Sequence, residues 1–235
     1  MLQPLVRIGA VAALVGAPTL LVATLLHPSQ ADPSDPAAAF AEYAADSTWV
    51  ASHLGQFVGV AMLGVALLAL GATMEVGKPS AWARVGILGT AASLAATAAL
   101  QAVDGVALKI MVDRWARANG EARARAFESA FAVRQIEIGL ASLLSVLFGL
   151  TVLVFGISML ISQRFPKWLG WLGFIGGIGT IAAGIAQAYV GFSTLAMTLS
   201  MSASSVLLLW AMLLGLCLWR LAPQLAGAND SISFR

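Results

Sequence analysis

The sequence predicts an all-α polytopic membrane protein, a bundle of six transmembrane helices with a helical hairpin projecting between helices three and four. Of the 235 residues, 60% are hydrophobic and only 10% are charged. A soluble domain carries about 25% charged residues, so this composition excludes a soluble enzyme, a disordered regulator and a nucleic-acid-binding protein. The formal net charge of +2 is small and indicates no particular partner. The single cysteine, Cys217, excludes an internal disulfide and a cysteine-based metal centre.

The spans follow from the uncharged runs of the chain. A helix needs about 20 apolar residues to cross a hydrocarbon core of roughly 30 Å. Four uncharged runs have about this length, and a fifth, 168–219, is long enough for two helices. We divide it at Gly191–Thr194, where small and polar residues gather. The predicted transmembrane domain covers 1–222 and precedes a short polar tail, 223–235; its spans are 8–26, 54–74, 85–104, 138–163, 168–190 and 198–219.

The first span is predicted to stay in the mature protein as a membrane helix. Its apolar core is longer than the roughly 7–15 residues of a signal peptide, and no small-x-small cleavage site follows it. Lys and Arg in short loops indicate which side of the membrane is cytoplasmic. The connection 27–48 has neither, but it contains Asp32, Asp35, Glu42 and Asp46. We therefore expect a multi-pass protein of the cell membrane with both termini in the cytoplasm, although the third connection is basic.

That third connection, 105–137, is predicted to be the helical hairpin. Opposite charges recur four residues apart, where helix neighbours meet; the pairs are Lys109 with Asp113, Asp113 with Arg117, and Glu121 with Arg125. Alanine, the strongest helix former, fills positions between them, and Asn119-Gly120 is a natural break. The basic residues of the hairpin are expected to dock a protein partner or the anionic headgroups of the lipid bilayer; they are Arg114, Arg117, Arg123 and Arg125.

Strongly polar residues gather at the outer membrane boundary when about 20 residues are counted from the inner end of each span. Charges near lipid are costly unless they pair, or face the bundle interior or a water cavity. This cluster is predicted either to bind a small ligand, an ion or a lipid headgroup, or to brace the bundle. Its members are His53, Asp104, Lys109, Arg134, Glu137, Gln101, Gln187 and Tyr189. Asp104 is expected to be an ion-pair partner of Lys109 or Arg134, or else a functional acid.

Two alternative functions remain open. Two imidazoles and two carboxylates suit Zn²⁺, which would make the chain a membrane-embedded metal-dependent hydrolase; that ligand set is His27, His53, Asp104 and Glu137. No motif spaces these ligands, so we expect a non-enzymatic protein without a cofactor and assign no catalytic residue. The other alternative is an accessory subunit that docks its partner through the 105–137 hairpin.

Overall fold

Among the residues that the computed structural model describes, six helices are long and apolar enough to cross a membrane, which confirms the predicted all-α, six-span bundle. The structure describes residues 2–230, and their side chains as far as 225. Every regular element within this part of the chain is helical. The long helices are α1 (Leu2–Leu25), α3 (Trp49–Ala72), α4 (Lys78–Gln101), α6 (Gly120–Ile161), α7 (Lys167–Val190) and α8 (Thr194–Asp230). The chain is therefore an integral membrane protein.

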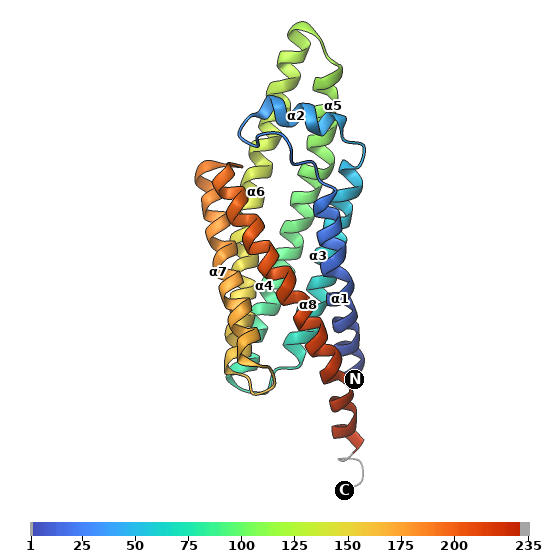
Figure 1. The fold of residues 1–235 in the computed structure, drawn as a ribbon, viewed down its shortest axis with the longest axis vertical. Coiled ribbons are helices and arrows are strands. Elements are labelled where there is room, and N and C mark those ends of the chain that lie inside the picture. Colours follow the sequence, from blue (N-terminus) through green and yellow to red (C-terminus); the bar gives the residue numbers. More distant parts are fainter. Residues whose placement is uncertain (1, 231–235) are drawn as a thin grey trace.

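The helices form two close pairs that α8 joins. α6 packs along α7, α1 packs along α3, and α8 crosses obliquely from α7 to α1 (Figure 1). Small residues permit the first of these contacts, since a Cβ added at Gly149 would lie 2.7 Å from the carbonyl oxygen of Gly177. Such backbone contact is how helices associate in lipid, where apolar burial gives no drive between them.

An additional helix closes one end of the bundle. Residues 27–48 are predicted from the sequence to be a connection, whereas the structure contains α2 (Pro36–Ala45) within them. The carboxylate of Asp35 accepts hydrogen bonds from two backbone N–H groups of the first turn, and Pro36 occupies the first helical position. α2 lies across the bundle beside α5 and α6 (Figure 1). Its Phe40 is fully buried. We call this the hairpin end, because the 105–137 hairpin projects from it.

The hairpin forms as predicted, with one irregularity. α4 continues through a π-helix, η1 (Ala102–Leu108), into α5 (Lys109–Arg117), so that one helical rod runs from Lys78 to Arg117. The chain then reverses, and Gly120 starts α6 with a φ of +53°, a left-handed conformation that glycine adopts without strain. This confirms the break predicted at Asn119-Gly120.

The turn between the last two spans also lies where the sequence places it. α7 ends at Val190, Gly191 has a φ of +62°, and α8 begins at Thr194. At its other end α8 continues to Asp230, so residues 223–230 of the predicted polar tail are helical, and 231–235 lie outside the described residues. The start of α1 and the last described turn of α8 lie together at the end of the bundle opposite the hairpin (Figure 1).

Candidate metal centre

Two histidines and one aspartate converge at the hairpin end from three different elements. His27 follows the end of α1, His53 lies in the second turn of α3, and Asp104 lies in η1. One potential ligand atom of each side chain lies within 4.8 Å of the other two. His53 is buried, Asp104 is 15% exposed, and His27 is half-buried, so the group lies just below the protein surface.

The backbone fixes the orientation of both imidazoles. Pro28 follows His27 at the end of α1, and its carbonyl oxygen lies 2.7 Å from His27 Nδ1. The carbonyl oxygen of Trp49, one helical turn before His53, lies 2.7 Å from His53 Nδ1. Because a carbonyl oxygen only accepts, Nδ1 is the protonated nitrogen of each ring. In the neutral imidazoles Nε2 therefore carries the lone pair.

A glycine and a π-helix bring Asp104 against His53. A Cβ added at Gly105 would lie 2.6 Å from Cβ of His53, so only glycine permits this approach of η1 to α3. π-Helical turns are rare and frequently occur at functional sites. The indole Nε1 of Trp49 donates a hydrogen bond of 3.1 Å to the backbone carbonyl of Asp104, which fixes the two elements together.

The contact between His53 and Asp104 is close but is not an aligned hydrogen bond. His53 Nε2 lies 3.0 Å from Asp104 Oδ2. Neither His53 Nε2 nor Asp104 Oδ1 has a hydrogen-bond partner within the described residues, and both atoms are buried. Two acceptor atoms at this separation repel each other unless a proton or a cation neutralises them.

Aromatic rings cover the three polar side chains. The ring of Trp49 lies 4.5 Å from His53 and 4.8 Å from His27 between centroids, and the two imidazoles are 5.1 Å apart. Burial lowers the pKa of His27 below its ordinary value, although the nearby Asp104 carboxylate opposes the shift. Burial raises the pKa of Tyr43, whose ring packs on Trp49 at 4.3 Å. At neutral pH His27 is therefore a neutral imidazole and Tyr43 a neutral phenol.

The two basic residues of the predicted cluster bind α2 instead of Asp104. Lys109 Nζ donates to the carbonyl oxygens of Tyr43 and Ala44 at 2.9 and 3.2 Å. The guanidinium of Arg134, only 2% exposed, donates to the hydroxyl of Tyr43 at 3.0 Å and to the carbonyl of Pro33 at 2.9 Å. The expected pairing of Asp104 with Lys109 or Arg134 is corrected by this geometry, because Asp104 faces His53.

The remaining predicted members are divided between the site and the rest of the bundle. Glu137 is 5% exposed, its Oε2 has no hydrogen-bond partner in the described structure, and it is not a member of the group formed by His27, His53 and Asp104. Gln101 donates a 3.2 Å hydrogen bond to Gln56, between α4 and α3. Gln187 is buried on α7, and no hydrogen bond of the described side chains joins it to the histidines. Tyr189 is 86% exposed and therefore does not line the cluster.

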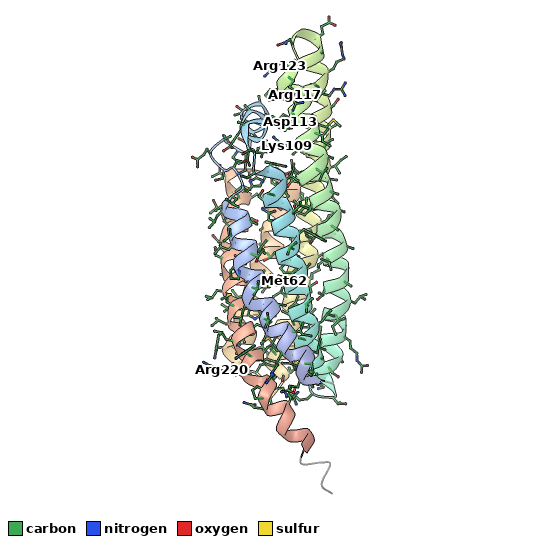
Figure 2. The ribbon with its side chains drawn as sticks, turned by 90° about the vertical axis from the view of Figure 1, so that its right-hand side faces the viewer. Met62, Lys109, Asp113, Arg117, Arg123 and Arg220 are labelled. Atoms are coloured by element: carbon green, nitrogen blue, oxygen red, sulfur yellow. The ribbon has the colours of Figure 1, made fainter. Side chains whose placement is uncertain are left out.

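The hairpin carries two of its three predicted ion pairs. Lys109 pairs with Asp113 at 2.9 Å and Arg125 with Glu121 at 3.3 Å, whereas Arg117 has no carboxylate within 4 Å among the described residues. Figure 2 shows the charged side chains along this part of the molecule, above the apolar length of the bundle. The hairpin is therefore a charged, solvated projection, and its partner stays a prediction.

Two site residues were missed by sequence reasoning. Tyr43 and Trp49 form the aromatic cover. Tyr43 lies in the segment 27–48 that was interpreted as a connection, and Trp49 lies between that segment and the predicted span 54–74. A detectable signal existed, since Asp35-Pro36 is a typical helix start and Phe40 and Tyr43 follow at helical spacing. No protein-family model, curated protein or solved structure matches the chain, so its geometry and chemistry carry the functional argument.

Proposed function

We propose that this integral membrane protein binds a divalent transition-metal ion of the zinc class at the hairpin end, through His27, His53 and Asp104. The ion would lie where α1, α3 and η1 meet, and would join three elements that are distant in the sequence. This is the ion-binding form of the function predicted for the polar cluster, with a smaller set of ligands.

The observation that carries the proposal is the orientation of the two imidazoles. Each uses Nδ1–H to bind a backbone carbonyl oxygen, at 2.7 Å in both cases. Metal-binding histidines typically make this second hydrogen bond, because it fixes the tautomer and makes Nε2 a better ligand. A carboxylate oxygen already lies 3.0 Å from one Nε2, so a cation would neutralise two facing acceptors.

The chemistry of the donors favours zinc over magnesium or calcium. Imidazole nitrogen suits Zn²⁺ and its transition-metal neighbours, whereas magnesium and calcium prefer oxygen ligands alone. Zinc bonds of about 2.0–2.1 Å would place tetrahedral ligand atoms about 3.3 Å apart. The three potential ligand atoms lie within 4.8 Å of one another in the structure, so zinc binding requires only a small movement of the side chains toward each other. The side chains lie at or near element ends and in a π-helix.

The competing interpretation is an ion pair between protonated His53 and Asp104, without a metal. Metal analysis and thermal melting of detergent-purified protein, with and without chelator, distinguish the two. At a free zinc concentration 100 times Kd, binding adds about 2.7 kcal/mol, or roughly 5–10 °C of melting temperature for a chain of this size. We expect one metal per chain in the wild type and a melting temperature that falls on chelation.

Single substitutions show which residues bind the metal and cause the melting temperature to fall on chelation. His27→Ala and Asp104→Asn should lose both the metal and the chelator response, and His27 lies at a helix end where truncation spares the fold. Asp113→Asn is the matched control, because that carboxylate lies on the same helical rod and pairs with Lys109. Wild-type protein that holds no zinc after zinc loading, with melting unchanged by chelator, would refute the proposal.

A second candidate function rests on the hairpin. A groove of about 290 Å³ lies between the α2–α3 connection and α5, and its charged lining residues are Asp46, Lys109, Asp113 and Arg117. The exposed Arg114 lies one turn before Arg117. The groove lining is balanced in charge, and the two exposed arginines beside it support docking of an acidic segment of a partner subunit. Native mass spectrometry would then show a partner on wild-type protein and none on an Arg114→Glu/Arg117→Glu variant purified in parallel.

A further inference from the structure

The short helix α2 is hydrogen-bonded to the segment of chain that follows His27. The carboxylate of Glu42, on α2, accepts hydrogen bonds from the backbone N–H groups of Gln30 at 2.8 Å and Ala31 at 3.0 Å. Hydrogen bonds from N–H groups to a carboxylate are charge-assisted and roughly twice as strong as neutral ones. The position of α2 therefore restrains the path of the chain beyond His27.

A second link lies at the other end of α2. Asp46 ends this helix, and its Oδ1 accepts hydrogen bonds from the backbone N–H of Thr48 at 2.7 Å and from the Thr48 hydroxyl at 2.8 Å. The same hydroxyl lies 3.4 Å from the carbonyl oxygen of Leu26, which directly precedes His27. The end of α2, the end of α1 and the start of α3, which carries His53, are thereby joined.

Aromatic rings of α2 contact both the metal centre and the hairpin. The ring centroid of Tyr43 lies 4.3 Å from that of Trp49 and 6.2 Å from that of His27. The ring of Phe40, one turn earlier, is fully buried and lies 6.1 Å from Trp115 of the hairpin. A change in the position of α2 would therefore alter the cover of the metal centre and the surface of the hairpin together.

The present position of α2 leaves one buried carboxylate oxygen without a partner. Asp46 Oδ2 is buried without a hydrogen bond, and Asp46 forms no ion pair with the described basic side chains. Burial lowers the pKa of His27, and the Asp46 carboxylate is among the charges that oppose this shift. A buried charge without a partner is costly, and a divalent cation at the histidines would reduce that cost. A bound metal and the closed position of α2 therefore stabilise each other.

We infer that α2 is a metal-controlled lid: a metal ion at His27, His53 and Asp104 holds α2 against the hairpin, and loss of the metal releases it. This inference rests on the proposed metal site and adds a switching function, because occupancy of the site determines the position of α2. The coupling is reciprocal, so any gain in metal affinity that depends on α2 equals a gain in the stability of closed α2. If α2 opens only when the metal leaves, free metal at about 100 times Kd reduces the open population about 100-fold.

Hydrogen–deuterium exchange measures the open population of α2. Full-length protein in lipid nanodiscs is compared with free zinc at about 100 times Kd and with chelator, and metal per chain is measured on the same samples. We expect amide exchange in 36–45 to slow by about 100-fold with zinc, and exchange at the hairpin tip, 119–125, to stay unchanged.

Two variants test the two links separately. Glu42→Ala removes the acceptor for Gln30 and Ala31, and Asp46→Asn removes the charge while it retains the shape of the side chain. Both should reduce the slowing measured at the same free zinc concentration, and Asp46→Asn keeps the test valid if Glu42→Ala does not fold. Glu128→Ala is the matched control, an exposed carboxylate on α6, and should match the wild type.

Metal-loaded wild type whose exchange in 36–45 is unchanged by zinc would overturn the inference while the proposed function stands, because the metal would then bind without holding α2. Slowing by the full wild-type factor in both link variants has the same consequence. Wild type that binds no metal refutes both proposals.

Discussion

Gly105→Ala should separate η1 from α3 and damage the metal centre without changing any ligand. The added Cβ would lie 2.6 Å from Cβ of His53, and ordinary contact begins at 3.4 Å, so the elements must part by about 0.8 Å. The Cβ of His53 is attached directly to the α3 backbone, so no side-chain rotation can relieve this contact. The distance of 3.0 Å between His53 Nε2 and Asp104 Oδ2 would then approach 3.8 Å.

Overpacking of this kind typically costs about 1–3 kcal/mol, which corresponds to a fall in melting temperature of roughly 2–12 °C for a chain of this length. The assay is thermal melting in detergent together with zinc titration of metal-free protein, for which we expect at least a tenfold loss of affinity. Gly139→Ala is the control, because a Cβ there meets nothing within 4 Å and alanine favours the helix. Unchanged melting and unchanged zinc affinity in Gly105→Ala would refute the described approach of η1 to α3.

Three further predictions concern the ends of the bundle. Arg134→Ala removes two charge-assisted hydrogen bonds to the α2 region, worth about 1.5–3 kcal/mol each, so amide exchange in 36–45 should accelerate by at least about 100-fold. Arg125→Ala, at an exposed site, should leave exchange unchanged. Burial opposes ionisation of Glu75, but the hydroxyl of Ser162 and Arg164 lower its pKa below the ordinary 4.5. Stability from Glu75 is therefore complete above pH 4.5 and lost as pH falls through the lowered pKa, a dependence that Glu75→Gln should remove in melting curves. If both termini are cytoplasmic, as the sequence predicts, an impermeant thiol reagent should label cysteine at Ser34 or Asn119 in intact cells and not at Lys78; the reverse pattern would invert the orientation.

The six spans were predictable because they depend on local properties of the chain. Hydropathy and flanking charges determine where a helix crosses lipid, and glycine at 120 and 191 marks turns that need positive φ. The common level of His53 and Asp104 also followed from counting residues along each span. Their direct contact did not, because it depends on the π-helix and on the close approach at Gly105, neither of which has a sequence signature.

The incorrect pairings of the polar cluster have one physical cause, which is that α2 was not predicted. A short helix leaves unsatisfied carbonyl groups at its C-terminal end, and these attract a cation. Lys109 binds the carbonyls of Tyr43 and Ala44 there, and Arg134 binds the hydroxyl of Tyr43. Both basic side chains therefore bind α2, and Asp104 contacts His53 instead.

X-ray absorption at the zinc edge tests the metal centre most directly, because it reports the ligand atoms themselves. We predict that zinc-loaded wild-type protein has a first shell of nitrogen and oxygen at about 2.0–2.1 Å, with the outer-shell scattering of two imidazoles. A spectrum without imidazole scattering, or with sulfur at about 2.3 Å from Cys217, would contradict the assignment of His27, His53 and Asp104 as ligands.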